Sequence, residues 1–272
     1  MQPTPFHITR RGLLASTGAI GSLALLGGAP ALAQGTTLAV AAQGLPDSLI
    51  TGFSSFASLN LISQMLEPLV ATDAHGKLVP RLAISWTPES PDTWRFRLRE
   101  GVKFHDGKPF SADDVKFTLD YIIAPKSLYG TKARISRIDN VTVVDGSTIV
   151  IKTKGPFPTL LNGLTNIPIE PKHYVESAGR SGMTAAPMGT GPFKLARWVP
   201  GDRVEFTANP IYWGGKPQIE RLVIRQVPEG STRVATLLAR EVAISEELPI
   251  DLLSTVDKSR DAAVVSVEST VG

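Results

Sequence analysis

Several short stretches of the chain alternate hydrophobic and polar residues, as strands with one buried face do. In residues 94–99, tryptophan, phenylalanine and leucine alternate with arginine, so the arginines are expected to face water. Apolar, β-prone stretches at residues 36–42, 220–227 and 262–268 predict a first strand, a later strand and a closing strand. Strands are thus predicted along the whole chain.

Turn signals join some of these stretches into hairpins. Residues 141–151 contain an Asp-Gly dipeptide at their centre, and a Pro-Gly-Asp turn separates residues 193–198 from residues 203–207. Asp106 and Gly107 predict a further tight turn. The chain is therefore expected to contain antiparallel pairs.

Apolar residues recur at helical spacing in residues 59–69 and 232–239, which predicts two helices. A third is predicted to begin at Ser111, with Asp114 three residues later as in a capping box, and to end before Pro125. Helices and strands follow no strict β-α-β alternation. The sequence therefore predicts an α/β protein with mixed sheets.

Residues 1–33 are predicted to be an export signal that is removed after Ala33. Arg10 and Arg11 precede a Gly/Ala-rich apolar run, and an Ala-Leu-Ala cleavage pattern ends at Ala33. The paired arginines favour the twin-arginine route, while the general secretory route stays open. A buried or membrane-spanning helix is disfavoured because four glycines and Pro30 interrupt the run.

Charge and cysteine content exclude several classes of partner. The formal net charge is +3, and removal of residues 1–33 takes away two arginines and no acidic residue. A nearly neutral mature surface without a basic run argues against nucleic acid and anionic membranes as partners. The chain has no cysteine, which excludes disulfides, thiol catalysis, zinc–thiolate sites and a lipid-anchored cysteine.

Few residues have the spacing of a catalytic or metal site, and no cofactor is expected. The sequence has no HExxH and no GxSxG pattern. His105 next to Asp106 could form a general base with its orienting carboxylate, but a hairpin turn favours a surface pair. Gly189 and Gly191 lack the lysine of a phosphate-binding loop, so they are interpreted as turn residues with positive φ.

Two segments are candidates for ligand binding. One is the loop after the first predicted strand, a usual place for ligands in α/β proteins, which carries Phe53, Ser54, Ser55 and Phe56. The other is Glu246 with Glu247, which could bind a cation or a ligand ammonium, or could be acids at a helix start ahead of Pro249. Trp213, beside two glycines, could stack on a ligand, although locking a loop onto the core is favoured.

The order of motifs resembles a known family. Residues 78–120 combine turns, strands and a capped helix, and MGTGPF (188–193), WVPGD (198–202) and NPIYWGGKP (209–217) follow. This arrangement resembles the extracytoplasmic solute-binding proteins of family 5, the substrate-binding proteins of peptide- and oligopeptide-type ABC transporters. The resemblance covers nearly all of residues 37–270.

The resemblance implies a periplasmic-binding-protein fold of type II, with two lobes joined by a hinge. Residues 36–65 and 166–270 would form the first lobe, and residues 66–165 would form a smaller inserted subdomain. Family members are longer, so the chain is expected to be an N-terminal portion without the second lobe. Residues 34–272 alone would then expose apolar surface, and they are expected to be marginally stable or prone to associate.

The resemblance also implies a function. The chain would be the periplasmic component of an importer, binding peptides or similar small solutes and delivering them to a membrane permease with its ATPase subunits. Relatives also take nickel chelates, opines, haem or sugars. The alternatives are a receptor or chaperone without a transport role, a non-functional truncated fragment and, less favoured, a secreted hydrolase.

Two residues depart from the family's pattern. Arg240 stands where the family usually has glycine, and Ala243 stands where it has aspartate. Both differences bear on the local turn and on any polar contact made there.

Overall fold

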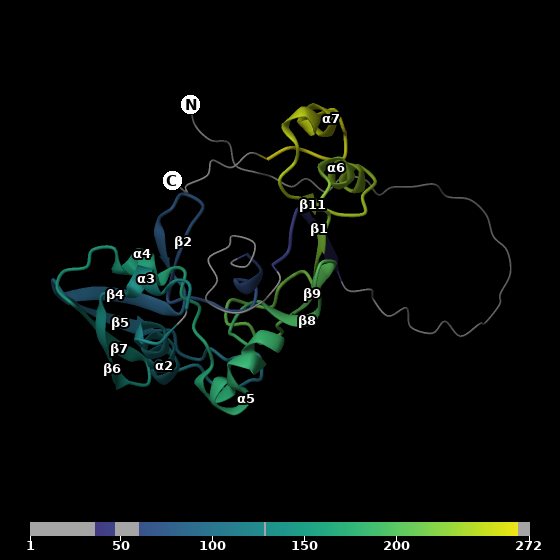
Figure 1. Cartoon of the computed structure of the whole chain (residues 1–272). Helices are drawn as coiled ribbons and strands as arrows, with labels where there is room; N and C mark the ends of the chain where they lie inside the picture. Colours follow the sequence, from purple (N-terminus) through teal and green to yellow (C-terminus); the bar gives the residue numbers. More distant parts are fainter. Residues whose placement is uncertain (1–35, 47–59, 128, 266–272) are drawn as a thin grey trace, which may run out of the picture. The chain divides into compact units, whose positions relative to one another are not determined.

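The computed structural model describes residues 36–46, 60–127 and 129–265 (Figure 1). By its internal contacts the chain divides into residues 1–34 and residues 35–272, and all described residues belong to the second unit. The predicted export signal lies outside the described residues.

The first sheet has five strands and mixed pairing. Strand β1, next to the edge strand β11, is parallel to both of its neighbours, β10 and β11, while β10, β9 and β8 form an antiparallel meander. The strand order is β11 (Ile244–Ser245), β1 (Thr37–Ala42), β10 (Arg221–Gln226), β9 (Arg203–Ala208) and β8 (Phe193–Val199). The predicted mixed sheet is thereby confirmed.

The second sheet has four antiparallel strands. Their order is β4 (Ala83–Ser90), β5 (Thr93–Leu98), β7 (Thr148–Thr153) and β6 (Ile138–Asp145). Phe96 and Leu98 are buried while Arg97 between them is exposed, as the alternation predicts. A short ribbon of β2 (Val70–Thr72) and β3 (Leu78–Pro80) precedes this sheet in the chain.

Each larger sheet has its own hydrophobic core. One core takes all of its fully buried members from residues 69–169, and the other takes its members from residues 40–66 and 175–222. α2 (Ala112–Ile123) lies along β6 (Figure 1) and buries Val115, Leu119 and Ile122. The short helices α3 (Lys132–Ile135) and α4 (Leu160–Leu164) contribute to the same core.

The N-terminus of α2 is fixed as the capping-box pattern predicts. The carboxylate of Asp114 accepts the Ser111 backbone N–H over 2.9 Å and, through its other oxygen, the Lys172 backbone N–H over 2.9 Å. Lys172 begins α5 (Lys172–Ala185), so one side chain ties the starts of two helices. Burial raises the pKa of Asp114 despite these hydrogen bonds.

The remaining helices lie near the carboxyl end of the described chain. α6 (Gly230–Leu238) connects β10 to β11, crossing over β1 between them, and the chain continues through η1 (Ile250–Leu252) and α7 (Leu253–Asp257). No helix in the described part of the chain is both long and apolar enough to cross a bilayer.

Two sequence-based expectations, a closing strand and a helix, differ from the structure. Residues 262–265 of the predicted closing strand are not in a strand, and residues 266–268 lie outside the described part. The strand beside β1 at the edge of the first sheet is β11, which the sequence did not predict because it is only two residues long. Residues 60–62 of the predicted helix at 59–69 are helical, and residues 63–65 form a turn.

The role expected for Gly189 and Gly191 is wrong. Neither glycine has a positive φ in the structure. A Cβ at Gly189 would lie 2.3 Å from the Met65 carbonyl oxygen, and one at Gly191 would lie 2.6 Å from the Gln64 carbonyl oxygen. Glycine is therefore required for the close approach of two backbones, which sequence periodicity does not reveal.

Candidate functional site

Three parallel strands end at the same edge of the first sheet. Ala42 of β1 pairs with Gln226 of β10, and Ala41 pairs with Ser245 of β11. The carboxyl ends of β1, β10 and β11 therefore converge, with β1 between two strands that a crossover connects. Ligands of open α/β sheets bind at such positions.

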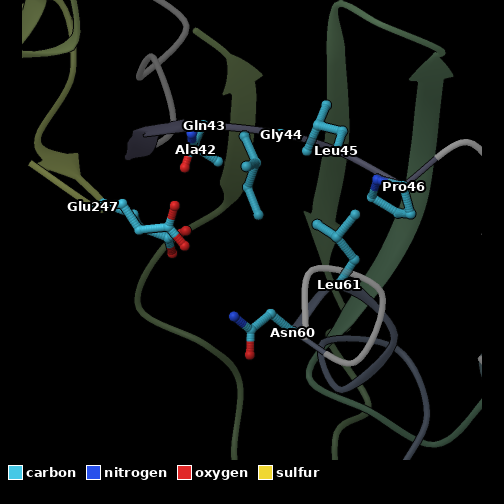
Figure 2. Close-up of a pocket in the computed structure, with 10 residues that line it drawn as sticks. Ala42, Gln43, Gly44, Leu45, Pro46, Asn60, Leu61 and Glu247 are labelled. Atoms are coloured by element: carbon cyan, nitrogen blue, oxygen red, sulfur yellow. The ribbon is translucent and has the colours of Figure 1, made fainter. Parts of the chain in front are cut away.

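A cavity of about 400 Å³ lies at this edge (Figure 2). Residues 42–46, which end and follow β1, make one wall, while Asn60 and Leu61 face the cavity from another. Its other lining residues are Ile224, Glu246 and Glu247. The lining combines apolar side chains with amides and two carboxylates, a composition suited to orienting a small polar solute.

The two glutamates are placed by their backbone. The Glu246 N–H donates to the Ala41 carbonyl over 2.9 Å, so the residue directly continues the pairing of β11 with β1. Glu247 has a φ of 51°, in the left-handed region that few non-glycine residues adopt. In Figure 2 its carboxylate reaches into the space that the amide of Asn60 approaches from the opposite side.

The surroundings of Glu246 shift the pKa of its carboxyl group. Glu246 is exposed as a whole residue, but the cavity walls remove part of the water around its carboxyl group and so raise its pKa. Repulsion from the neighbouring Glu247 raises the pKa further. Among the described residues, neither carboxylate forms an ion pair, so the cavity presents negative charge without a counterion from the surrounding chain.

The sequence identified part of this site. Glu246 and Glu247 line the cavity, but they are not at a helix start, because η1 begins only at Ile250. Phe53, Ser54, Ser55 and Phe56 lie outside the described residues. Gln43 and Asn60 were missed. Gln43 directly follows the first predicted strand, a signal that could have identified it.

The postulated catalytic pair is not formed. Asp106 pairs with His173, whose Nε2 lies 2.8 Å from Oδ2, rather than with His105. The His105 ring is half-buried and is not paired with Asp106, so the expectation of a surface pair is also wrong. Its Nε2 lies 3.1 Å from the Gly191 carbonyl oxygen and its Nδ1 lies 3.4 Å from the Gly189 nitrogen. Burial lowers the pKa of His105 to about 4, so the ring is a neutral link to the glycine loop.

Trp213 locks a loop onto the core. Its indole N–H donates to the buried carboxylate of Glu67 over 2.7 Å, and the Arg99 guanidinium lies 4.0 Å from the centre of its ring. These contacts occupy both the polar edge and a face of the indole. The structure therefore supports the interpretation that Trp213 locks the loop.

Within the described residues, no group of three or more acidic or histidine side chains is arranged to hold a metal ion. The cavity at the strand ends offers a solute two carboxylates, two side-chain amides and an apolar wall.

Comparison with known proteins shows the family to which the chain is similar. The profile of the bacterial extracellular solute-binding proteins, family 5, matches residues 77–271. A Brucella ovis protein named as an ABC transporter peptide-binding protein is 35% identical over 241 residues, which are 84% of this chain and 45% of that protein. The chain thus spans less than half the length of this relative.

Solved structures of solute-binding proteins have a similar fold over part of their length. NikZ from Campylobacter jejuni in complex with Ni(L-His) superposes with a TM-score of 0.77 at 29% identity, covering 82% of this chain and 45% of NikZ. AppA, an oligopeptide-binding protein of Bacillus subtilis in complex with a nonapeptide, has a TM-score of 0.76 at 25% identity. The match covers 84% of this chain and 47% of AppA. Both are periplasmic binding proteins of type II.

Proposed function

The chain belongs to the bacterial extracellular solute-binding proteins of family 5, and from this membership we propose that it is the solute-binding component of an ABC importer. It binds a peptide or similar small solute and delivers it to a membrane permease with its ATPase subunits. The observation that carries the proposal is the cavity where β1, β10 and β11 end. It lies where open α/β sheets bind ligands, and two carboxylates without an ion-pair partner among the described residues line it. No covalent step is required.

The described residues provide one wall of the binding cleft. Residues 36–65 and 166–270 make up the first lobe, and residues 66–165 make up an inserted subdomain. Supporting this division, the two sheets draw on separate segments and have separate cores. A solute that touches a second lobe as well as this wall favours the closed arrangement of the lobes over the open one.

The charge of the cavity indicates the class of solute. Two carboxylates without a counterion favour a group that brings positive charge, such as the ammonium of a peptide. The amides of Gln43 and Asn60 can hydrogen-bond a peptide backbone next to that group. We therefore favour a peptide with a free amino terminus or another amine-bearing solute.

Export precedes this function. Residues 1–33 act as a twin-arginine signal, Arg10 and Arg11 are its recognition pair, and cleavage follows Ala33. The mature protein then works in the periplasm, where the solute is met before transport.

Isothermal titration calorimetry on the intact protein, purified from the periplasm, tests the binding. We expect trialanine to bind at least tenfold more tightly than N-acetyl-trialanine, because acetylation removes the ammonium. The double variant Glu246→Gln, Glu247→Gln should remove that preference. An absence of binding to either peptide, or an unchanged preference in the double variant, would reject the assignment.

A further inference from the structure

A buried arginine stands behind the wall that carries Glu246 and Glu247. Arg233 lies in the first turns of α6 and is only 3% exposed. A buried cation is costly unless its donors are satisfied, so the partners of this guanidinium indicate what it stabilises.

The guanidinium donates only to backbone carbonyls. Nη1 donates to Val227 over 2.8 Å and to Pro228 over 2.7 Å, at the end of β10. Nε donates to Glu246 over 3.2 Å, and Nη2 donates to Glu247 over 2.7 Å. One planar group therefore joins the segment after β10 to the segment after β11.

This pattern leaves the glutamate carboxylates unpaired. Within the described part of the chain, Arg233 forms no ion pair with a carboxylate. It binds the main chain of Glu246 and Glu247 and not their side chains. The two carboxylates thus remain available to a solute, although the Arg233 guanidinium binds the main chain of the same two residues.

Two other features show that the segment is held under constraint. Glu247 has a φ of 51°, which costs a non-glycine residue free energy and persists only where neighbours impose it. The start of α6 also packs closely against Pro249. A Cβ at Gly230 would lie only 2.3 Å from the proline Cγ. The helix start therefore clamps residues 246–249 by its backbone and by the Arg233 side chain.

We propose that Arg233 is a positioning residue of the cavity: its guanidinium fixes the main chain of Glu246 and Glu247 so that both carboxylates face the solute. Arginine suits this role because its rigid fork satisfies several acceptors in one plane, whereas lysine has a single ammonium. That Arg233 fixes the main chain of Glu246 and Glu247 does not depend on the proposed function, whereas its effect on solute affinity rests on that function.

The geometric part is tested by carbon-13 NMR titration of the Glu246 carboxyl group in the intact protein. In the wild type the Glu246 pKa is expected above its ordinary value. Two variants remove the guanidinium: Arg233→Met, and Arg233→Lys, which keeps the positive charge and serves if the methionine variant does not fold. In both, residues 246–249 are expected to relax into solvent. The Glu246 pKa should then fall towards its ordinary value. Arg225→Met, which removes an arginine of β10 that pairs with Glu241 near the surface, is the control and should leave it unchanged.

The affinity part uses the same variants with trialanine and N-acetyl-trialanine. We expect the lysine variant to bind trialanine at least tenfold more weakly than the wild type while the Arg225 control binds normally. An unchanged Glu246 titration in both Arg233 variants overturns the positioning role. If the wild type binds neither peptide, the proposed function fails, and the titration still decides the role of Arg233.

Discussion

Trp213 donates its indole N–H to the Glu67 carboxylate over 2.7 Å, although the two residues are 146 positions apart. The Thr190 and Tyr212 hydroxyl groups each donate to the same carboxylate over 2.9 Å. Glu67 is 4% exposed. One buried acid thus joins the MGTGPF and NPIYWGGKP motifs, which explains in physical terms why they occur together.

Replacing Glu67 with alanine should destabilise the protein by about 3 kcal/mol, because the indole N–H loses its acceptor in a buried site. Glu67→Gln is the matched control. Its amide oxygen can accept from Trp213 and its NH₂ can donate to the Tyr212 oxygen, so the loss should be smaller. Urea unfolding of both variants at pH 7 checks this. Equal losses would show that packing and not hydrogen bonding sets the effect.

The same acid should give stability a defined pH dependence. Burial raises the pKa of Glu67 despite its three donors, so the folded state favours the protonated form. A raised pKa contributes stability that is fully present below the unfolded value of about 4.5 and is lost as pH rises through the folded value. The free energy of unfolding of wild type minus Glu67→Gln should therefore fall between pH 4 and pH 7. A flat or rising difference in urea titrations would contradict it.

His105 should act in the opposite direction. Burial lowers its pKa from 6.5 to about 4, so the unfolded state takes up the proton first. Stability is fully present above pH 6.5 and is lost as pH falls to about 4, by at most about 3 kcal/mol. His105→Gln can still donate to Gly191 but does not titrate. The free energy of unfolding of the wild type and of His105→Gln is measured from pH 7.5 to pH 4. Only the wild type should lose this stability as the pH falls.

Arg240 occupies a turn that suits glycine. Its φ is 60°, two residues after the end of α6, and its ion pair with Asp261 is exposed, with side chains 70% and 55% accessible. The left-handed conformation costs a non-glycine residue about 1 kcal/mol, and an exposed ion pair contributes little. Arg240→Gly should therefore raise the urea midpoint. Arg240→Ala, which loses the ion pair and keeps the strain, should not. A lower midpoint for the glycine variant would show that the ion pair outweighs the strain.

Local patterns predicted the regular elements well. The alternation of residues 94–99, the capping box at Ser111 and the Asp-Gly hairpin at 141–151 each depend on neighbours in sequence, and each element is found. The departure at Arg240 was identified through the family resemblance. Its physical meaning, a positive φ, required the backbone.

Long-range relationships could not be predicted in this way. The contact that excludes a Cβ at Gly189 comes from Met65, and the partner of Asp106 is His173 rather than its neighbour. Arg233 has no motif at all, because it binds only main-chain carbonyls. Glu246 and Glu247 were found as acids, but their place at the end of β11 depends on a two-residue strand.

Binding of an amine-bearing solute should weaken in mild acid through Glu246. The crowding of its carboxyl group by the cavity walls and by Glu247 raises its pKa, so it gains a proton at a higher pH than an ordinary glutamate. Protonation removes one of the two charges that attract the ammonium, and the effect is complete once pH has fallen through the raised pKa. Affinity for trialanine should therefore drop between pH 7 and pH 4.5.

Two controls separate this effect from loss of the fold. Glu246→Gln should bind trialanine more weakly at pH 7 and should show a flatter pH profile, since the titrating group is gone. N-acetyl-trialanine should show little change with pH in either protein, because it carries no ammonium. Calorimetry at each pH, with circular dichroism to verify folding, distinguishes the cases. A pH profile that is identical in wild type and Glu246→Gln would assign the titration to another group and remove Glu246 from the binding wall.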